Sequence, residues 1–275
     1  MTNSRQRTFG AIGLTLGLVA LMLILILTAL HAVGTDAALY YKLQAQAGVL
    51  PEAGISADDL RDLDAELAKY LAGDPGQALA LPLDSEPGAF SILPLQVDGE
   101  LRPAFNEKEM AHLRDCAALF ALLRKVRRRL IAWAVLLIVG GAYLLNDRKK
   151  ARSVAWLSPL ILLIPLGAFA LWAAIDCDAA FVFFHRALFD NDLWLLDPRT
   201  DLLIRICPES MFMAMGKAIA LRCAAILVGV PAIAAGLALI WPKSKSNEGN
   251  KWNDNRATRR ASAQRPKTFG VGGKR

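Results

Sequence analysis

The chain has 275 residues, of which 55% are apolar, and it carries a formal net charge of +7 at pH 7. This apolar fraction is higher than that of an ordinary soluble domain, which excludes a purely water-soluble globular protein. The positive charge lies mainly beside long apolar runs and in the last part of the chain. It is therefore a membrane-topology signal rather than a nucleic-acid-binding surface.

The apolar residues fall in four runs that predict transmembrane helices. They are residues 9–32, 130–145, 154–175 and 218–241, and a bilayer core of about 30 Å needs about 20 residues of helix. The second run is shorter, and it spans if flanking arginines reach toward the headgroups and the bilayer thins locally. The first run exceeds the apolar core of a signal peptide and lacks a small-x-small cleavage site after it. We therefore expect an uncleaved helix rather than a cleaved signal.

Basic residues predict which ends of these helices face the cytoplasm. Arg5 and Arg7 precede the first helix, and four basic residues lie between positions 148 and 152. The segment 242–275 holds ten lysines or arginines against two acidic residues. If all four helices cross the membrane, these three regions share one side, and the positive-inside tendency assigns that side to the cytoplasm. Both termini are therefore expected in the cytoplasm.

The two remaining long segments are acidic and are expected on the outer side. Residues 34–123 hold six basic and fifteen acidic residues (6 − 15 = −9), and residues 176–216 hold three and seven (3 − 7 = −4). One cluster opposes this assignment, because residues 124–129 include five arginines or lysines on the predicted outer side. These either bind anionic headgroups of the outer leaflet or indicate a different topology.

The predicted fold is mainly α, a polytopic membrane protein with a small mixed α/β extracytoplasmic domain between transmembrane helices one and two. Its segments are the N-terminus with helix one (1–33), the extracytoplasmic domain (34–123), helix two (124–146), a cytoplasmic loop with helix three (147–175), an extracytoplasmic loop (176–216), helix four (217–241) and a cytoplasmic tail (242–275). The tail is basic and lacks apolar periodicity, so it is expected to be disordered.

Local signals inside the extracytoplasmic domain predict short helices and a hairpin. Ser56 and Asp59 form a capping-box pattern, and apolar residues then recur at helical spacing. Further along, Asp98-Gly99 separates residues 93–97 from residues 100–105, an arrangement typical of a two-residue β-hairpin. A domain of this size is not expected to be stable without packing on the helices.

One histidine lies in a long predicted helix. Asn106 caps the start of this helix, and Glu109 can reach back to the free backbone N–H groups. His112 follows, with Asp115 three residues later on the same face. No glycine or proline interrupts residues 106–139. A single helix is therefore expected to run from the extracytoplasmic domain into the membrane.

The chain has three histidines, and two of them are candidates for catalysis. His31 ends the first helix, where an interfacial role is expected, whereas His112 and His185 lie in outer segments beside transmembrane helices. Histidine suits proton transfer near neutral pH because its reference pKa is about 6.5. One histidine can take a proton from an attacking group while the other gives one to the leaving group. A nearby carboxylate such as Asp115 can fix a tautomer.

Other catalytic arrangements have weaker support in the sequence. There is no G-x-S-x-G motif, and neither Ser210 nor a cysteine stands in an activating pattern, so direct transfer is favoured over a covalent intermediate. Both histidines with Asp115 or Asp178 can form a three-ligand metal site. However, an H-E-x-x-H motif and cysteine pairs at zinc spacing are absent, and we predict neither a metal nor another cofactor. At most one disulfide is expected among the three outer cysteines.

The stretches around the two histidines resemble the bacterial lipoprotein intramolecular transacylase family. The first stretch is residues 105–115, FNEKEMAHLRD. The second is a series of short matches: Phe184-His185, residues 191–194, Asp197-Pro198, Thr200-Asp201 and Pro208-Glu209. The four-helix layout and the loop sizes match as well, so the resemblance covers residues 9–241.

The resemblance implies an acyl-transfer reaction. Such enzymes move the sn-2 acyl chain of a diacylglyceryl-modified lipoprotein to the α-amino group of its N-terminal cysteine, which gives the lyso-form lipoprotein. The two essential histidines of the family correspond to His112 and His185. Supporting residues are expected at Asp115, Glu109, Asp201 and Asn191, and contacts with the substrate or its oxyanion at Arg222, Trp194 and Phe184. Three positions depart from the family pattern, namely Cys116, Asp190 and Cys207.

The resemblance also implies a location and partners. The protein is expected in the bacterial cytoplasmic membrane with its active site on the outer face. Its expected partners are diacylglyceryl lipoproteins and membrane lipids, without nucleic acid, and the chain is expected to act as a monomer. Aromatic residues for the acyl path, or for ordinary interfacial packing, are Phe181, Phe183, Phe184, Phe189 and Trp194. Two other functions remain compatible with the sequence: a metal-dependent membrane hydrolase, and a non-catalytic envelope protein whose loops bind a partner.

Overall fold

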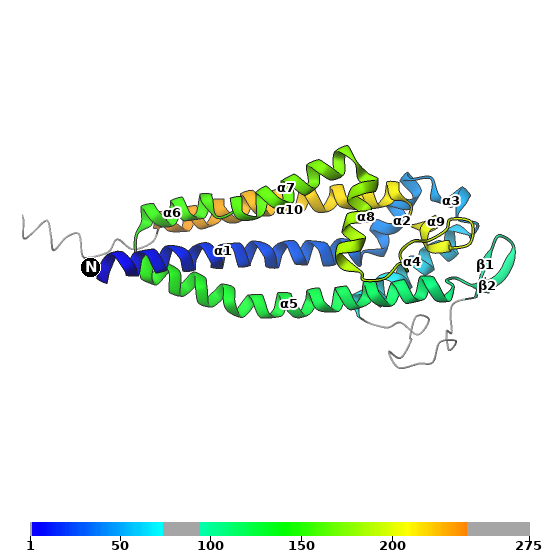
Figure 1. The fold of residues 1–275 in the computed structure, drawn as a ribbon, viewed down its shortest axis with the longest axis horizontal. Coiled ribbons are helices and arrows are strands. Elements are labelled where there is room, and N and C mark those ends of the chain that lie inside the picture. Colours follow the sequence, from blue (N-terminus) through cyan, green and yellow to red (C-terminus); the bar gives the residue numbers. More distant parts are fainter. Residues whose placement is uncertain (1, 74–93, 241–275) are drawn as a thin grey trace, which may run out of the picture.

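The computed structural model describes residues 2–73 and 94–240, and it is dominated by long helices that run along one axis (Figure 1). Four stretches are long and apolar enough to cross a membrane: Ser4–Gly34, Glu107–Leu145, Arg148–Ile175 and Glu209–Ile240. They contain the four predicted transmembrane runs except Trp241, which lies outside the described residues, and they confirm a mainly α, multi-pass architecture. The predicted tail and part of the proline-rich stretch after residue 73 lie outside the described residues.

The elements follow in chain order, and the short ones gather at one end of the long helices (Figure 1). Their bounds are α1 (Thr2–Gly34), α2 (Ala37–Gln46), α3 (Val49–Glu52), α4 (Ala57–Ala72), β1 (Pro94–Val97), β2 (Glu100–Pro103), α5 (Glu107–Leu145), α6 (Arg148–Leu157), α7 (Leu160–Ile175), α8 (Cys177–Leu188), α9 (Leu202–Ile206) and α10 (Glu209–Ile240). We call the end formed by α2, α3, α4, α9 and the hairpin the head.

The predicted local signals are realised in the head. The Ser56 side chain accepts a hydrogen bond from the backbone N–H of Asp59 at 3.0 Å and caps α4. β1 and β2 form the predicted antiparallel hairpin, with Val97 opposite Glu100. The two turn residues, Asp98 and Gly99, have φ values of 55° and 87°, and this left-handed pair matches the twist of a tight hairpin.

The core of the head joins segments from both halves of the chain. Leu60, Phe105, Met110 and Ile206 are among its buried side chains, and they come from α4, the start of α5 and α9. The head therefore packs around the first turns of α5 instead of standing alone, as the small size of the domain predicted. This packing fixes the position of residues 105–115 relative to residues 191–211.

Helix α5 connects the head with the far end of the transmembrane bundle. It runs without interruption for 39 residues, a length of about 58 Å at 1.5 Å per residue. An Asn106–Glu109 capping box starts the helix, which confirms the predicted cap and the predicted single helix. His112 therefore sits on a helix whose other end is anchored in the membrane.

Helices α1 and α5 pack against each other through glycines at the end away from the head. A Cβ atom added to Gly10 would lie 2.3 Å from the backbone nitrogen of Leu145, and one added to Gly141 would lie 2.3 Å from that of Leu14. Such distances are far inside van der Waals contact, so only glycine lets the two backbones approach this closely. We call this contact the glycine seam.

Helix α7 is packed in a different way. The chain breaks between α6 and α7 at Ser158-Pro159, whereas α7 and α10 continue through Pro165 and Pro231. None of the residues of α7 is buried within the described structure. Its apolar side chains are therefore available to lipid, and α7 contacts α8 through the rings of Trp172 and Phe183, whose centroids are 5.2 Å apart.

Candidate active site

The two candidate histidines, far apart in sequence, lie next to each other where α8 meets α5. Figure 1 shows α8 crossing from the end of α7 toward α5. The ring centroids of His112 and His185 are 6.2 Å apart, and the two residues are only 8% and 7% exposed. Two imidazoles at this separation can both contact one bound ester group.

The tautomer of His185 is fixed by its own helix. Its Nδ1 lies 2.8 Å from the backbone carbonyl oxygen of Phe181, one turn earlier. A carbonyl oxygen only accepts, so Nδ1 carries the hydrogen, and the neutral ring keeps a lone pair on Nε2. Burial lowers the pKa of His185, partly opposed by the hydrogen bond to Phe181. The neutral, proton-accepting form is therefore favoured near neutral pH.

Aromatic side chains enclose His185 on several sides. The Trp194 ring stacks on it with centroids 4.9 Å apart, and the Phe181 ring lies at 3.9 Å. Phe184 contacts its edge at 5.4 Å and is 45% exposed, and Phe189 packs beside both histidines, 5.0 Å from His112 and 5.8 Å from His185. These rings form an apolar wall that excludes water and leaves an exposed aromatic rim.

His112 has one partnered and one unpartnered nitrogen. Its Nε2 lies 3.6 Å from the thiol sulfur of Cys116, one turn later on α5. The thiol can donate to a lone pair on Nε2 or accept a hydrogen from it, so this contact is compatible with both neutral tautomers. Nδ1 is buried and has no hydrogen-bond partner in the described part of the chain. It is therefore the nitrogen of His112 that a bound substrate can contact.

Asp115 and Asn191 connect the two histidine segments. The Asn191 amide donates from Nδ2 to Oδ2 of Asp115 at 2.9 Å, and its backbone carbonyl accepts from Nε1 of Trp194 at 2.9 Å. Trp194 in turn stacks on His185. Asp115 was expected to help fix a histidine tautomer; its hydrogen-bond partner in the structure is Asn191, which links it to the aromatic wall.

A second network ties the start of α5 to the loop after α8. Glu109 is fully buried, and its two carboxylate oxygens accept from the backbone N–H groups of Asn106 and Leu203 at 2.7 and 2.6 Å. Asp201 accepts from the Asn106 amide and from the Asp197 backbone, each at 2.8 Å. Burial raises the pKa of Asp201, but these hydrogen bonds outweigh it and lower the pKa overall. The network fixes the start of α5 relative to residues 197–203.

Arg222 does not join this cluster. Its Nη1 donates to the carbonyl oxygen of Ala218 on its own helix at 3.1 Å. Within the described residues, no hydrogen bond or ring contact links it with either histidine. The structure therefore brings together all the predicted site residues except Arg222. Sequence analysis missed two partners, the Phe181 carbonyl and the Cys116 thiol, although both lie one helical turn from a histidine.

The described residues contain no group of three His, Cys, Asp or Glu side chains arranged to hold a metal ion. The four cysteines are free thiols. What the site does hold is a pair of buried imidazoles: Nε2 of His185 can accept a proton, and Nδ1 of His112 has no partner among the described residues. Such a pair can move a proton within a single bound molecule without a cofactor from the protein.

The comparison with family models identifies one family. Residues 15–212 match the family model described as lipoprotein intramolecular transacylase Lit. A search of curated protein sequences gave no match. Among solved structures, the chain is similar to lipoprotein intramolecular transacylase Lit from Bacillus cereus, with 22% identity and a TM-score of 0.54 over 86% of this chain and 94% of that one.

Two further structures of the Bacillus cereus protein, each with a histidine substituted, have similar folds. The alanine variant shares 22% identity with this chain at a TM-score of 0.54, covering 86% of this chain and 92% of that one. The arginine variant shares 24% identity at a TM-score of 0.52, covering 86% and 90%. At this identity the likeness establishes the fold.

Proposed function

Because residues 15–212 match its model, this chain belongs to the lipoprotein intramolecular transacylase family, and we propose how its site performs the reaction. The protein is an acyltransferase of lipoprotein maturation. It moves the sn-2 acyl chain of a diacylglyceryl-modified lipoprotein onto the α-amino group of the N-terminal cysteine of the same molecule. The observation that supports this assignment to the site is the buried, aromatic-walled pair of His112 and His185.

The reaction is an attack of a neutral amine on an ester carbonyl within one molecule. A bond forms between the amine nitrogen and the carbonyl carbon, the bond to the glycerol oxygen breaks, and one proton passes from nitrogen to that oxygen. No covalent enzyme intermediate is needed. Holding the amine and the ester together supplies a large part of the rate acceleration, because the reacting groups are already joined and need only be oriented.

His185 is the proton acceptor in this proposal. Its Nδ1 hydrogen is held by the Phe181 carbonyl, so Nε2 presents the lone pair. The imidazole takes the proton of the attacking amine and returns it to the departing glycerol oxygen, as a single histidine does in other acyl transfers. Its depressed pKa keeps it neutral and ready to accept.

His112 is the hydrogen-bond donor. Its Nδ1 is buried without a partner in the described structure, and the Cys116 thiol occupies Nε2. A neutral imidazole that donates Nδ1–H stabilises negative charge on the carbonyl oxygen as the amine attacks. The alternative role for His112 is to give the glycerol oxygen its proton directly. The two roles make different demands on a substitute side chain, because an amide can replace a hydrogen-bond donor but cannot replace a proton donor.

The aromatic wall has two tasks in this proposal. It excludes water, which would otherwise compete with the amine for the ester, and its exposed rim of Phe183 and Phe184 meets the acyl chain. Asn191 and Asp115 hold Trp194 in its stacked position. Glu109 and Asp201 hold the segment that carries His112 against the segment that follows His185. They influence the rate by keeping the two histidines at their observed separation.

The orientation in the membrane is also a proposal. The head and the histidines face outward, with both termini and residues 147–153 in the cytoplasm, as the positive-inside tendency predicts. Residues 124–129 then lie at the outer headgroup level, where their positive charges meet anionic lipid. The domain boundaries given above follow from this orientation, and the chain acts as a monomer on lipoprotein substrates.

A labelled lipopeptide tests the function. The purified protein is reconstituted in phospholipid vesicles with a synthetic peptide whose N-terminal diacylglyceryl cysteine carries a deuterated sn-2 chain. We expect the mass of the peptide to stay unchanged while fragmentation places the deuterated chain on the α-amino nitrogen. Release of deuterated fatty acid would instead indicate hydrolysis, and an unlabelled N-acyl chain would indicate transfer from vesicle lipids. Either result contradicts the proposal.

A further inference from the structure

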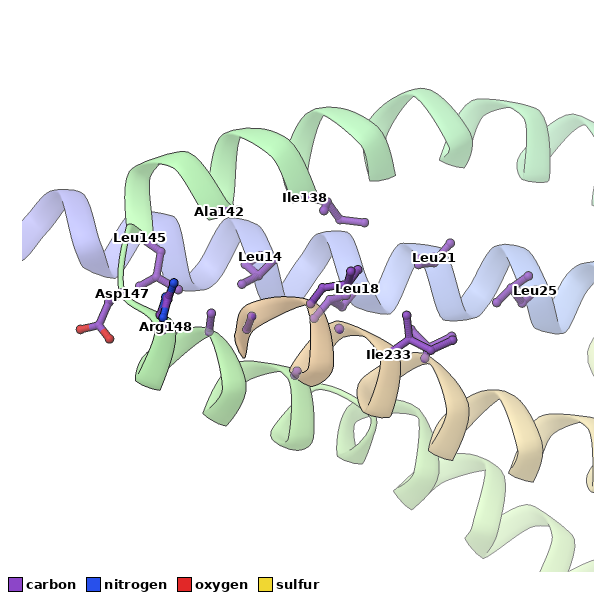
Figure 2. A pocket seen from close by; sticks show the side chains of 16 residues that line it. Leu14, Leu18, Leu21, Leu25, Ile138, Ala142, Leu145, Asp147, Arg148 and Ile233 are labelled. Carbon is purple, nitrogen blue, oxygen red and sulfur yellow. The ribbon is translucent and has the colours of Figure 1, made fainter. Parts of the chain in front are cut away.

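An apolar cavity lies at the end of the bundle away from the histidines. It has a volume of about 370 Å³ and is bounded by α1, α5, α6 and α10. Figure 2 shows aliphatic side chains from three of these helices pointing into it, among them Leu14 and Leu18 of α1, Ile138 of α5 and Ile233 of α10. The volume is in the range of small-molecule binding sites, which is about 300–1,000 Å³. Nothing in the proposed reaction uses this cavity.

The mouth of the cavity is charged. Asp147 and Arg148, which lie where α5 turns into α6, line it (Figure 2). Asp147 is already engaged, because Oδ1 accepts from the backbone N–H of Lys150 at 3.1 Å and Oδ2 lies 4.0 Å from Nη1 of Arg7. The Nε atom of Arg148 is buried and has no hydrogen-bond partner in the described part of the chain. Arg148 thus has donor capacity that the neighbouring carboxylate does not use.

Positive charge continues on the outside of this mouth. Lys149, Lys150 and Arg152 follow Arg148 in α6 and are exposed. The N-terminus of α6 adds its partial positive charge at the same place. A ligand that fits both parts of the site must therefore combine an apolar chain with an anionic group.

The bilayer supplies such molecules at this depth. Water does not occupy a cavity that lacks polar partners, and an unfilled void loses dispersion contacts with its lining. A lipid tail fills the space without either cost. Because that tail is already in apolar surroundings in the bilayer, apolar contact alone does not select among lipids. The selection must come from the charges at the mouth.

We propose that this cavity binds one acyl chain of an anionic phospholipid, with the phosphate held by Arg148. The site is separate from the lipoprotein substrate, because it lies at the opposite end of the bundle from His112 and His185. A lipid bound there contacts α1, α6 and α10 together. It would fasten α6 to the bundle at the point where the chain turns back into the membrane.

Native mass spectrometry of the full chain in detergent tests this proposal. The protein is titrated with phosphatidylglycerol and, separately, with phosphatidylethanolamine of the same acyl chains. We expect one phosphatidylglycerol to bind at least fivefold more tightly than phosphatidylethanolamine. Arg148→Gln should abolish this preference, whereas Lys42→Gln, an identical loss of charge on an exposed residue of the head, should keep it. Equal affinity for both lipids, or an equal loss in both variants, would overturn the site.

A matched pair of alanine substitutions on α10 tests the apolar half of the site. Ala234 lines the cavity, whereas Ala232 on the same helix is exposed and does not line it. Ala234→Leu fills part of the cavity and should weaken phosphatidylglycerol binding at least fivefold, while Ala232→Leu should leave it unchanged. Unchanged binding in Ala234→Leu would overturn the proposed acyl-chain position. The two charge variants keep the test decisive if Ala234→Leu does not fold.

Discussion

The two histidines are carried by helices that are anchored in different ways. His112 belongs to α5, which runs alongside α1 and meets it backbone to backbone at the glycine seam (Figure 1). His185 belongs to α8, which follows α7, a helix with no buried residue in the described structure. We call α1 and α5 the frame, and α7 and α8 the arm. His112 thus belongs to the frame. His185 belongs to the arm, whose helix α7 has its apolar side chains available to lipid.

This difference suggests how a bulky substrate reaches a buried site. The arm is held to the frame near its tip, by the contacts of Asn191 with Asp115 and of Asp201 with Asn106. We expect substrate access to move α7 and α8, because few buried contacts are lost there, while α1 and α5 stay in place. Substitutions can test both the separate roles of the two histidines and this difference in packing.

The largest effect is expected from His185→Ala on the arm. Loss of the proton acceptor should reduce the initial rate of acyl transfer by about 10²- to 10⁴-fold, the range for general acid–base catalysis. The rate is measured in vesicles with the diacylglyceryl lipopeptide. Arg186→Ala, an exposed neighbour on the same helix, is the matched control and should retain the rate. A His185→Ala variant with more than a tenth of the activity would contradict the assigned role.

The rate loss on substituting His112 should depend on whether the new side chain can still donate a hydrogen bond. His112→Ala removes the donor and is expected to lower the rate about 10²- to 10³-fold, as loss of an oxyanion donor does. The amide nitrogen of His112→Asn can take the place of Nδ1, so this variant should recover at least tenfold over His112→Ala. If both variants are equally inactive, His112 is a proton donor rather than a hydrogen-bond donor.

The packing difference predicts unequal responses to the same substitution in two helices. Gly141→Ala puts a methyl group against the α1 backbone and should destabilise the protein by about 1–3 kcal/mol. Gly167→Ala in α7 meets no atom within 4 Å and should have little effect on stability. Thermal unfolding in detergent measures both. Equal melting temperatures for the two variants would remove the distinction between frame and arm.

Much of this arrangement was predictable from sequence, and the reasons are local. The apolar runs, the Asn106–Glu109 capping box and the Asp98-Gly99 turn each depend on neighbouring residues, and each prediction was confirmed. The resemblance identified His112 and His185, and the structure places them together. The family match confirms the acyl-transfer activity.

Other features depend on contacts between residues that are far apart in the chain, and the spacing of residues in one sequence does not reveal such contacts. The glycine seam requires the relative position of α1 and α5, which only the packed bundle defines. Asp115 lies within reach of His112 by helical spacing, yet Asn191, distant in sequence, takes its hydrogen bond. Arg222 was expected to contact the substrate or its oxyanion, and this stays a prediction: its Nη1 donates to the carbonyl oxygen of Ala218 on its own helix.

A smaller effect is expected in the pH dependence of the rate. Burial lowers the pKa of His185 below its ordinary value of 6.5, so the base stays neutral as the pH falls through 6.5 and is lost at lower pH. Trp194→Ala exposes the ring and should move this pKa back upward. The ratio of wild-type to variant rate should therefore rise as the pH falls from 7.5 to 5.5. The substrate amine titrates equally in both proteins, so its titration cancels in this ratio. A constant ratio would contradict the role of burial.

The smallest effect is expected from Cys116→Val on the frame. The thiol sulfur lies 3.6 Å from Nε2 of His112 and makes one weak hydrogen bond with it, and valine leaves that nitrogen in apolar surroundings. We expect a rate loss of less than about tenfold, because one weak hydrogen bond contributes about 1 kcal/mol. The measurement is the same lipopeptide assay. A loss as large as that of His112→Ala would assign the thiol a direct part in the chemistry.

The most direct test of the central claim is the chemical state of lipoprotein N-termini in cells. Fragmentation mass spectrometry compares cells that make the wild-type chain, His112→Ala or His185→Ala, each at matched levels in the membrane. We predict N-acyl, monoacylglyceryl cysteine only with the wild-type chain and unchanged diacylglyceryl cysteine with either variant. Wild-type conversion by either alanine variant would contradict the claim that these two imidazoles perform the transfer.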